Sequence, residues 1–386
     1  MLFEEKKRTR QEPLRPGENL YEFYDQCARK GYKEVRSILN GWLDEMPPDD
    51  GAELANRMRK RGDSNFRHGF CELIVHALLV RLTSQVEVHP QVKGTRKRPD
   101  FSAIHAGDAR RTYVEVTTIN PSDERIAEGN RENGLYNAID ECNLPAGCML
   151  GYELVRAGKG SPSMQKVVLE IETWAATKVA AAQNEVFSRR FSVDDWDFEL
   201  ELIPTTNSEP VERAIGMVHI GGEWITPNFD LRTTCESKSY RYGRLDSPYL
   251  IAVSDCTDQL WGASQIFRHA AEALFGDEVV EISHSGKTQH TRNPNGFWIG
   301  ANGPRNRNVS AVMILPPPVL WTFRSDPHPP LLAINPWAEH TLPEQFDRLP
   351  RMIVENDKPV LNDGEQIADI LGLPDPWPPN EGTNVA

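Results

Sequence analysis

Two acidic residues, Asp100 and Glu115, lie on either side of a predicted β-hairpin within residues 98–118. The dipeptide Gly107-Asp108 is favoured as the two-residue turn, because Gly readily adopts the positive φ that such turns require. This turn pairs Asp100 directly with Glu115 and brings their Cβ atoms to about 5 Å. Two like charges so close destabilise the hairpin unless a cation lies between them. The hairpin therefore predicts a site for a divalent metal ion.

A third carboxylate, Glu72, lies within a predicted helix over residues 66–82. Apolar residues nearly surround this helix, so we expect it to be buried. Glu72 and His76 are four residues apart and share one face. A buried carboxylate needs a partner or a metal ion, and a satisfied Glu72–His76 pair is the alternative to metal binding.

The strand that follows the turn shows a period of two. Val114 and Val116 alternate with Glu115 and Thr117, so the last two side chains project to the same side. Thr117 is therefore expected to face the predicted metal site.

A basic loop precedes the hairpin and contains Lys93, Arg96, Lys97 and Arg98. Its charges could hold a phosphate backbone beside the metal, which is a sequence-independent contact. The alternative is an ordinary solvated loop.

Carboxylates beside a basic loop suit metal-assisted hydrolysis of a phosphodiester bond. Oxygen ligands favour Mg²⁺ or Mn²⁺, which usually bind one or two carboxylates and keep several waters. Such an ion acidifies a water molecule and stabilises the charge that develops on the phosphate.

Three sequence features together resemble the PD-(D/E)XK nuclease superfamily, which has the restriction-endonuclease-like fold. They are Glu72 on a buried helix, Pro99-Asp100, and Glu115-Val116-Thr117 on the following strand. The matched region covers residues 64–118, and the predicted helix and strand at 230–255 fit the family's continuing core. The resemblance implies that Asp100 and Glu115 bind the metal and that Glu72 completes or orients the site.

Thr117 departs from the family pattern, which places a lysine two residues after the glutamate to orient the attacking water. A hydroxyl cannot replace an ammonium as a charge donor to the transition state. Either a lysine arrives from elsewhere in the chain or the domain is inactive. Lys238 is our candidate, because it lies on a predicted helix that precedes the strand at 249–255 and could cover the sheet. A solvated helix lysine is the alternative.

Composition limits the partners. The 386 residues carry 43 basic and 56 acidic side chains and a formal charge of −13, so any nucleic-acid contact must be local. The first residues do not resemble a signal peptide, and no apolar run approaches the roughly 18 residues of a membrane helix. We therefore expect a cytoplasmic protein without a membrane partner. Six scattered cysteines form no C-x-x-C pair of the kind found in zinc sites.

Alternating helical and strand patterns predict an α/β fold with a restriction-endonuclease-like core, in which helices flank a mixed central sheet. We expect a helical N-terminal extension over residues 1–60 and a core over 61–318 that carries an insertion at about 120–228. Residues 319–386 are rich in proline, and we expect them to form a tail with little regular structure.

These observations and the resemblance predict a metal-dependent endonuclease, with DNA favoured over RNA as its substrate. A role in defence against foreign DNA rests on superfamily habit alone. The alternative is a catalytically inactive nuclease-like domain that binds nucleic acid or a protein partner. A third interpretation treats the hairpin carboxylates as solvated surface groups. The sequence leaves open whether the protein forms a homo-oligomer or needs an activating protein partner.

Overall fold

The computed structural model divides the chain into two compact units. The first comprises Met1–Glu12, Asn19–Asn120 and Thr226–Ala386, and the second comprises Pro13–Glu18 and Pro121–Ile225. The second unit corresponds closely to the predicted insertion at about 120–228. The structure describes residues 1–105, 108–179, 185–205, 213–219, 227–256, 263–282, 288–315, 318–320, 322–325 and 330–377.

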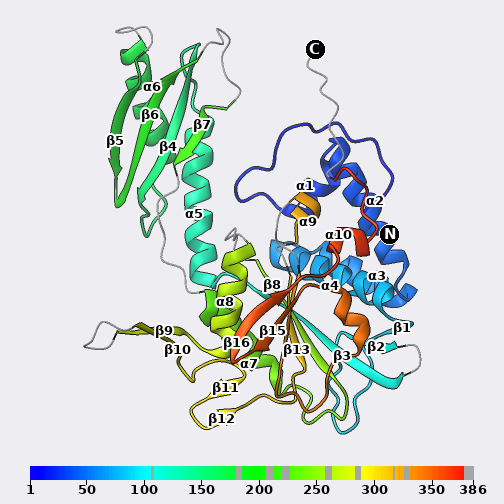
Figure 1. Cartoon of the computed structure of the whole chain (residues 1–386). Helices are drawn as coiled ribbons and strands as arrows, with labels where there is room; N and C mark the ends of the chain where they lie inside the picture. The colour runs from blue at the N-terminus through cyan, green and yellow to red at the C-terminus, as the bar shows by residue number, and fades with distance from the viewer. Residues whose placement is uncertain are drawn as a thin grey trace. The chain divides into compact units, whose positions relative to one another are not determined.

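An eight-stranded sheet forms the centre of the first unit (Figure 1). Its neighbours are parallel in some pairs, such as β3 and β8, and antiparallel in others, such as β2 and β3. The prediction of an α/β fold with a large mixed sheet flanked by helices is therefore confirmed. The strand order is β1 (Gln85–Val88), β2 (Phe101–His105), β3 (Asp108–Ile119), β8 (Tyr249–Asp255), β13 (Ala311–Leu315), β14 (Leu331–Ile334), β15 (Arg351–Glu355) and β16 (Lys358–Asn362).

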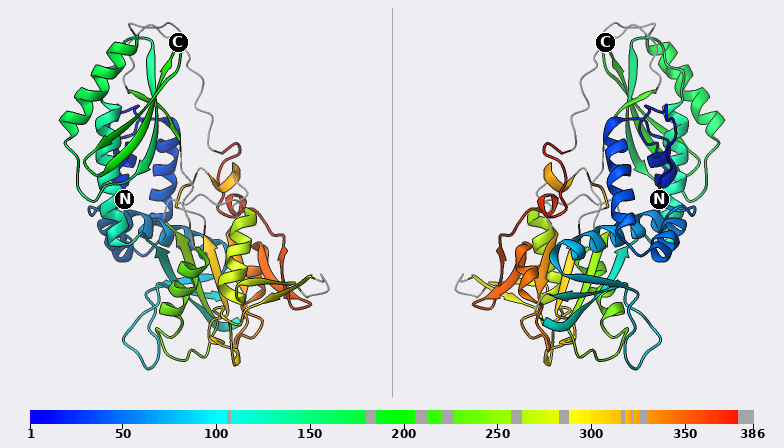
Figure 2. Two further views of the ribbon diagram at one scale, coloured as in Figure 1. Left: turned by 90° about the vertical axis from the view of Figure 1, so that its left-hand side faces the viewer. Right: turned by 90° about the vertical axis from the view of Figure 1, so that its right-hand side faces the viewer.

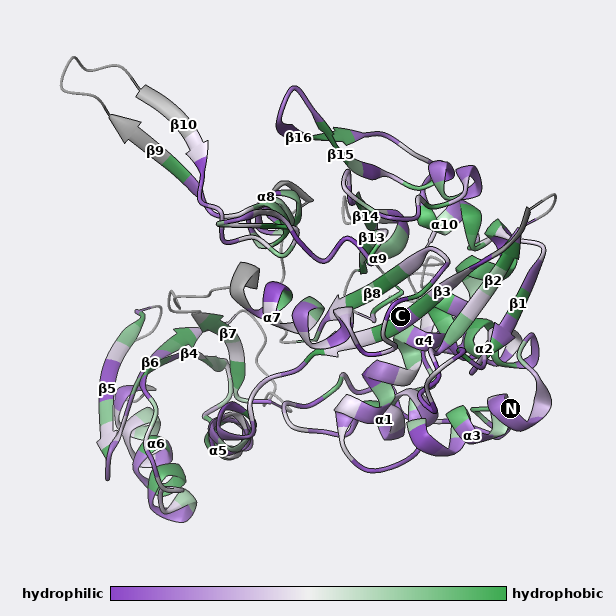
Figure 3. Ribbon diagram, turned by 90° about the horizontal axis from the view of Figure 1, so that it is seen from below, coloured by the Kyte–Doolittle hydropathy of each residue, from purple (hydrophilic) through white to green (hydrophobic). Residues whose placement is uncertain are grey.

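Helices cover both faces of this sheet, and the alternation of β3 shows which residues meet which helices. Val114 and Val116 pack into the same core as α4 (Asp63–Leu82). Tyr113 packs into a second core with residues of α7 (Pro227–Ser239) and α8 (Ala263–Phe275). Because side chains alternate along a strand, Glu115 and Thr117 lie on the α7 face. Apolar residues dominate the buried central strand β8 (Figure 3).

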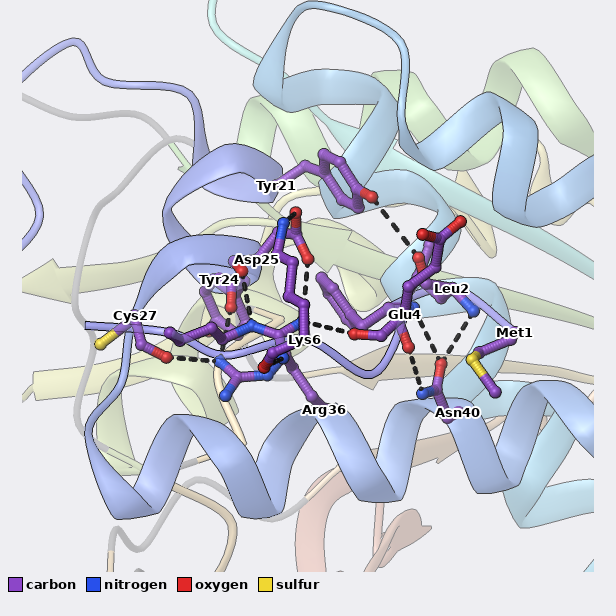
Figure 4. A network of polar contacts seen from close by, with 12 residues as sticks. Met1, Leu2, Glu4, Lys6, Tyr21, Tyr24, Asp25, Cys27, Arg36 and Asn40 are labelled. Carbon is purple, nitrogen blue, oxygen red and sulfur yellow. Dashed lines mark hydrogen bonds and ion pairs between the residues drawn. The ribbon is translucent and has the colours of Figure 1, made fainter. Parts of the chain in front are cut away.

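The N-terminal helices belong to the core that contains α4. They are α1 (Leu20–Gln26), α2 (Lys30–Asp44) and α3 (Pro48–Met58). Polar contacts fix the chain around them (Figure 4). The Asn40 side chain accepts from the backbone of Leu2 and Phe3 at 2.8 and 3.0 Å, and buried Arg36 donates to the carbonyl of Tyr24 at 2.7 Å. The extension is therefore integrated into the first unit rather than attached to its surface.

The prediction of a C-terminal tail with little regular structure is wrong. Strand β14 pairs with β13, and β15 and β16 continue the main sheet. Among the described prolines, Pro330 and Pro350 directly precede β14 and β15, and Pro359 lies in the edge strand β16, where a missing N–H is tolerated. Short elements of this region are α9 (Thr322–Ser325), the 3₁₀ helix Glu344–Arg348 and α10 (Ile367–Ile370).

Two small antiparallel sheets complete the described strands of the first unit. One joins β9 (Glu278–Ile282) and β10 (Thr288–Arg292), and the other joins β11 (Ile299–Gly300) and β12 (Gly303–Pro304).

The second unit has its own sheet and its own core. Helices α5 (Asp123–Asp140) and α6 (Met164–Val179) accompany a sheet in the order β5 (Phe187–Val193), β6 (Trp196–Pro204), β4 (Cys148–Arg156) and β7 (Ile215–His219). Its core includes Trp174, Phe191, Trp196 and Phe198. Because this core is separate, the insertion does not interrupt the packing of the main sheet.

Within the described part of the chain, no helix is both long and apolar enough to cross a membrane. All six cysteines are buried free thiols.

Replacement of Leu332 tests the placement of the C-terminal strands in the sheet. Leu332 on β14 is fully buried, so Leu332→Ala should lower the free energy of unfolding by about 2–5 kcal/mol in urea denaturation. The control Leu361→Ala on β16, where the side chain is 49% exposed, should change it by less than about 0.5 kcal/mol. Equal small effects would contradict this placement.

Candidate active site

The hairpin has the predicted register but not the predicted turn. Phe101 lies opposite Val114, and this register continues as far as Ile104 opposite Arg111. Asp108 is the first residue of β3 and pairs with His105 after a register shift, so a Gly107-Asp108 turn is wrong. Residue 107 itself lies outside the described residues. Away from the turn, the pairing of β2 with β3 is the predicted one, because the register shift lies between Ile104 and His105.

Asp100 directly precedes β2, where the register places it opposite Glu115. Its carbonyl accepts from the N–H of His89 at 2.9 Å, and its Oδ2 accepts from the N–H of Val116 at 2.6 Å. The carboxylate is thus fixed to the backbone of β3. Burial, together with the nearby carboxylates of Glu115 and Glu72, raises the pKa of Asp100 to about 7, although the hydrogen bond from Val116 acts in the opposite direction.

Glu115 is 3% exposed and is held by side chains from the end of α7 and the turn that follows. The Nζ of Lys238 lies 3.0 Å from Glu115 Oε1, and the Nε of Arg241 lies 3.4 Å from the same oxygen. The hydroxyl of Tyr242 donates to Oε2. Of the site residues predicted from the sequence, Lys238 therefore contacts Glu115 directly.

The local sequence explains how α7 delivers these groups. The helix ends at Ser239, and Gly243 has a φ of +73°, which lets the chain reverse towards β8. The hydroxyl of Tyr249 at the start of β8 donates to the Lys238 carbonyl at 3.1 Å. This contact fixes the last turn of α7 over the face of β3 that carries Glu115.

Glu72 is buried on α4 and has two cationic neighbours. Arg57 of α3 forms an ion pair with Oε2, and the Nε2 of His68 lies 2.9 Å from Oε1. Burial raises the pKa of Glu72, but His68 and Arg57 outweigh this effect and hold the pKa below its ordinary value. The carboxylate is therefore ionised and neutralised by protein side chains.

The alternative of a Glu72–His76 pair is wrong, because the histidine that pairs with Glu72 is one turn earlier, at position 68. The ring of His76 packs against Phe101 with centroids 5.6 Å apart. Burial lowers the pKa of His76 to about 4, so it is a neutral core residue. Both histidines are four residues from Glu72, and helix spacing alone could not choose between them.

Thr117 is buried on the same face as Glu115, as the alternation predicts. Within the described ranges, no group of three or more His, Cys, Asp or Glu side chains is arranged to hold a metal ion. Glu115 and Glu72 instead contact the protein's own cationic groups.

The basic loop between β1 and β2 lies beside the loop that follows α7 (Figures 1 and 2). The carbonyl of Arg98 is 3.1 Å from the hydroxyl of Tyr242, which joins the loop to the Glu115 site. The predicted phosphate-binding residues Lys93, Arg96, Lys97 and Arg98 are all exposed. They therefore form a cationic rim next to the buried carboxylates.

Four contributors to the site were missed by sequence reasoning: Arg57, His68, Arg241 and Tyr242. Arg241 and Tyr242 lie in the turn after α7, beyond its last residue Ser239, so helical spacing from Lys238 could not place them. Arg57 comes from a different helix, and its proximity to Glu72 depends on how α3 packs on α4.

No family model matches the chain, and neither a curated protein nor a solved structure matches it.

The raised pKa of Asp100 predicts how the stability of the protein depends on pH when a chelator removes divalent ions. Between about pH 4 and pH 7 the folded protein keeps a proton that the unfolded chain has lost, so this group lowers stability as the pH rises through that window. Asp100→Asn can still accept from Val116 and should be more stable than the wild type at about pH 8, by on the order of 1–3 kcal/mol. The difference should vanish near pH 4.

Urea denaturation at several pH values measures this difference directly. A variant that is less stable than the wild type at about pH 8 would contradict the electrostatic description of Asp100.

Proposed function

We propose that this protein is a divalent-metal-dependent nuclease that hydrolyses phosphodiester bonds, with DNA rather than RNA as its substrate. The order of α4, β1, β2, β3, α7 and β8 supports a restriction-endonuclease-like core. This order of helix, three strands, helix and strand covers residues 64–118 and 230–255, the regions in which the sequence resembles the PD-(D/E)XK superfamily. The second unit is inserted between β3 and α7 and leaves this order intact.

The observation that carries the proposal is the 3.0 Å distance between Lys238 Nζ and Glu115 Oε1. Position 117 is a threonine and provides no positive charge. An ammonium group nevertheless reaches the carboxylate from α7, and only 18% of the Lys238 side chain is exposed. This partial burial supports a positioned amine rather than a solvated helix lysine.

The donor set fits Mg²⁺ or Mn²⁺. Asp100 lies near two other carboxylates and forms no ion pair within the described part of the chain, so a cation at this place would relieve its repulsion. Asp100 and Glu115 would hold the ion, and Glu72 would complete or orient the site. The bound ion would supply Lewis acidity, which acidifies water and stabilises negative charge on phosphate.

The remaining residues have roles that follow from their contacts. Tyr242 holds the Glu115 carboxylate in place through its hydroxyl. Lys238 provides a fixed positive charge beside that carboxylate, where it can orient a water molecule and stabilise a developing charge. The cationic rim would hold the phosphate backbone without reading sequence.

One observation favours the alternative of a catalytically inactive domain that binds nucleic acid or a protein. Glu115 and Glu72 are both neutralised by protein cations, so two of the three carboxylates are balanced without a metal ion. The two functions make different predictions for the same assay.

Cleavage assays test the proposal. Purified full-length protein, incubated with plasmid and with single-stranded DNA, should cleave DNA in Mg²⁺ or Mn²⁺ but not in chelator. Asp100→Ala, Glu115→Ala and Lys238→Ala should each lower the rate at least about 100-fold, because the carboxylates would hold the metal ion and Lys238 would supply positive charge to the transition state. Lys358→Ala, an exposed lysine on the edge strand β16, is the matched control and should leave the rate unchanged.

Each contradictory result has a distinct meaning. Full activity of Lys238→Ala would exclude Lys238 as the replacement for the missing lysine. Activity that survives both carboxylate substitutions would overturn the site. Absence of cleavage on plasmid, single-stranded DNA and RNA, with binding retained, would support the inactive alternative.

A further inference from the structure

Tyr240 is an exposed aromatic residue at the edge of the Glu115 site. It is 66% exposed, and among the residues whose side chains the structure describes it is the only exposed aromatic. Its position lies between Lys238 and Arg241, which both contact Glu115. Turn geometry that directs these neighbours to the carboxylate leaves the Tyr240 ring in solvent, where it gains little from packing.

Basic residues lie next to the turn that contains Tyr240. The turn that contains it is joined to the basic loop through Tyr242, whose hydroxyl lies 3.1 Å from the Arg98 carbonyl. The rim residues Lys93, Arg96, Lys97 and Arg98 are exposed, and the described residues offer their side chains no ion pair. An exposed ring and free positive charges therefore border the same buried carboxylates.

We propose that this site takes an unpaired nucleotide, whose base stacks on the Tyr240 ring while the cationic rim holds the adjoining phosphates. The inference rests on the nuclease function proposed above and specifies its substrate class. In a duplex the faces of the bases are already stacked on each other, so an exposed aromatic ring can stack only on an unpaired or terminal base. Aromatic stacking combined with a short basic track is the usual way of binding single strands.

The charge of the chain supports the same substrate class. Because the net charge of the chain is −13, favourable contacts with phosphates are limited to the rim, which has four basic side chains. Duplex-binding surfaces usually neutralise many phosphates along both strands. A site with few phosphate contacts gains more from stacking, which tolerates any base because every base has a π-face.

Fluorescence anisotropy in chelator tests the inference without cleavage. The probes are labelled oligothymidine, oligouridine and a hairpin duplex of the same length, and the protein is the full chain. Tyr240→Ala should weaken single-strand binding about 5- to 150-fold and leave duplex binding unchanged. Tyr240→Phe keeps the ring and should bind like the wild type. Comparison of oligothymidine with oligouridine shows whether the site discriminates DNA from RNA.

The control is Leu361→Ala, which removes an exposed apolar side chain on β16 and should not affect binding. Unchanged single-strand affinity in Tyr240→Ala would overturn the stacking inference and leave the nuclease proposal intact. An equal loss on single strand and duplex would also overturn it. If the wild type binds none of the probes, the proposed nucleic-acid function itself fails.

Discussion

The ion pair between Glu115 and Lys238 is the interaction on which the site depends. Glu115 is buried on β3, and a buried charge is tolerated only when it is paired and hydrogen-bonded. Lys238, Arg241 and Tyr242 all satisfy it from the end of α7 and the turn after it. The same contacts thus fix α7 against the sheet and assemble the chemical groups of the site. Loss of one partner would leave a charge that is only partly compensated.

The three carboxylates differ in how they are neutralised, and this difference gives the site its electrostatic character. Glu72 has Arg57 and His68, which hold its pKa low despite burial. Asp100 has a backbone hydrogen bond but no ion pair among the described residues, and its pKa is raised to about 7 by burial and by the other carboxylates. The unbalanced negative charge is therefore concentrated at Asp100, which is where a divalent cation would bring the largest relief.

Local patterns predicted where the carboxylates lie but missed most of the side chains that contact them. The alternation around Glu115 fixed its face together with that of Thr117, and the apolar surroundings of Glu72 predicted a buried helix. The turn was wrongly predicted at Gly107-Asp108 because the even register from Phe101 to Ile104 does not reveal the shift between Ile104 and His105. Strand β14 was missed because neighbouring prolines dominated the composition. The partners of Glu72 depend on the packing of α3 and on a choice between two histidines, and neither is encoded in helix spacing.

Moving the lysine tests the central claim, that an ammonium from α7 serves the carboxylate in place of the residue at position 117. Thr117 lies on the same face of β3 as Glu115, so a lysine there can approach the same carboxylate. Cleavage rates should be measured for Lys238→Ala and for the double variant that adds Thr117→Lys. We predict that the double variant recovers at least about 10-fold of the lost activity. A folded double variant no more active than Lys238→Ala would contradict this claim.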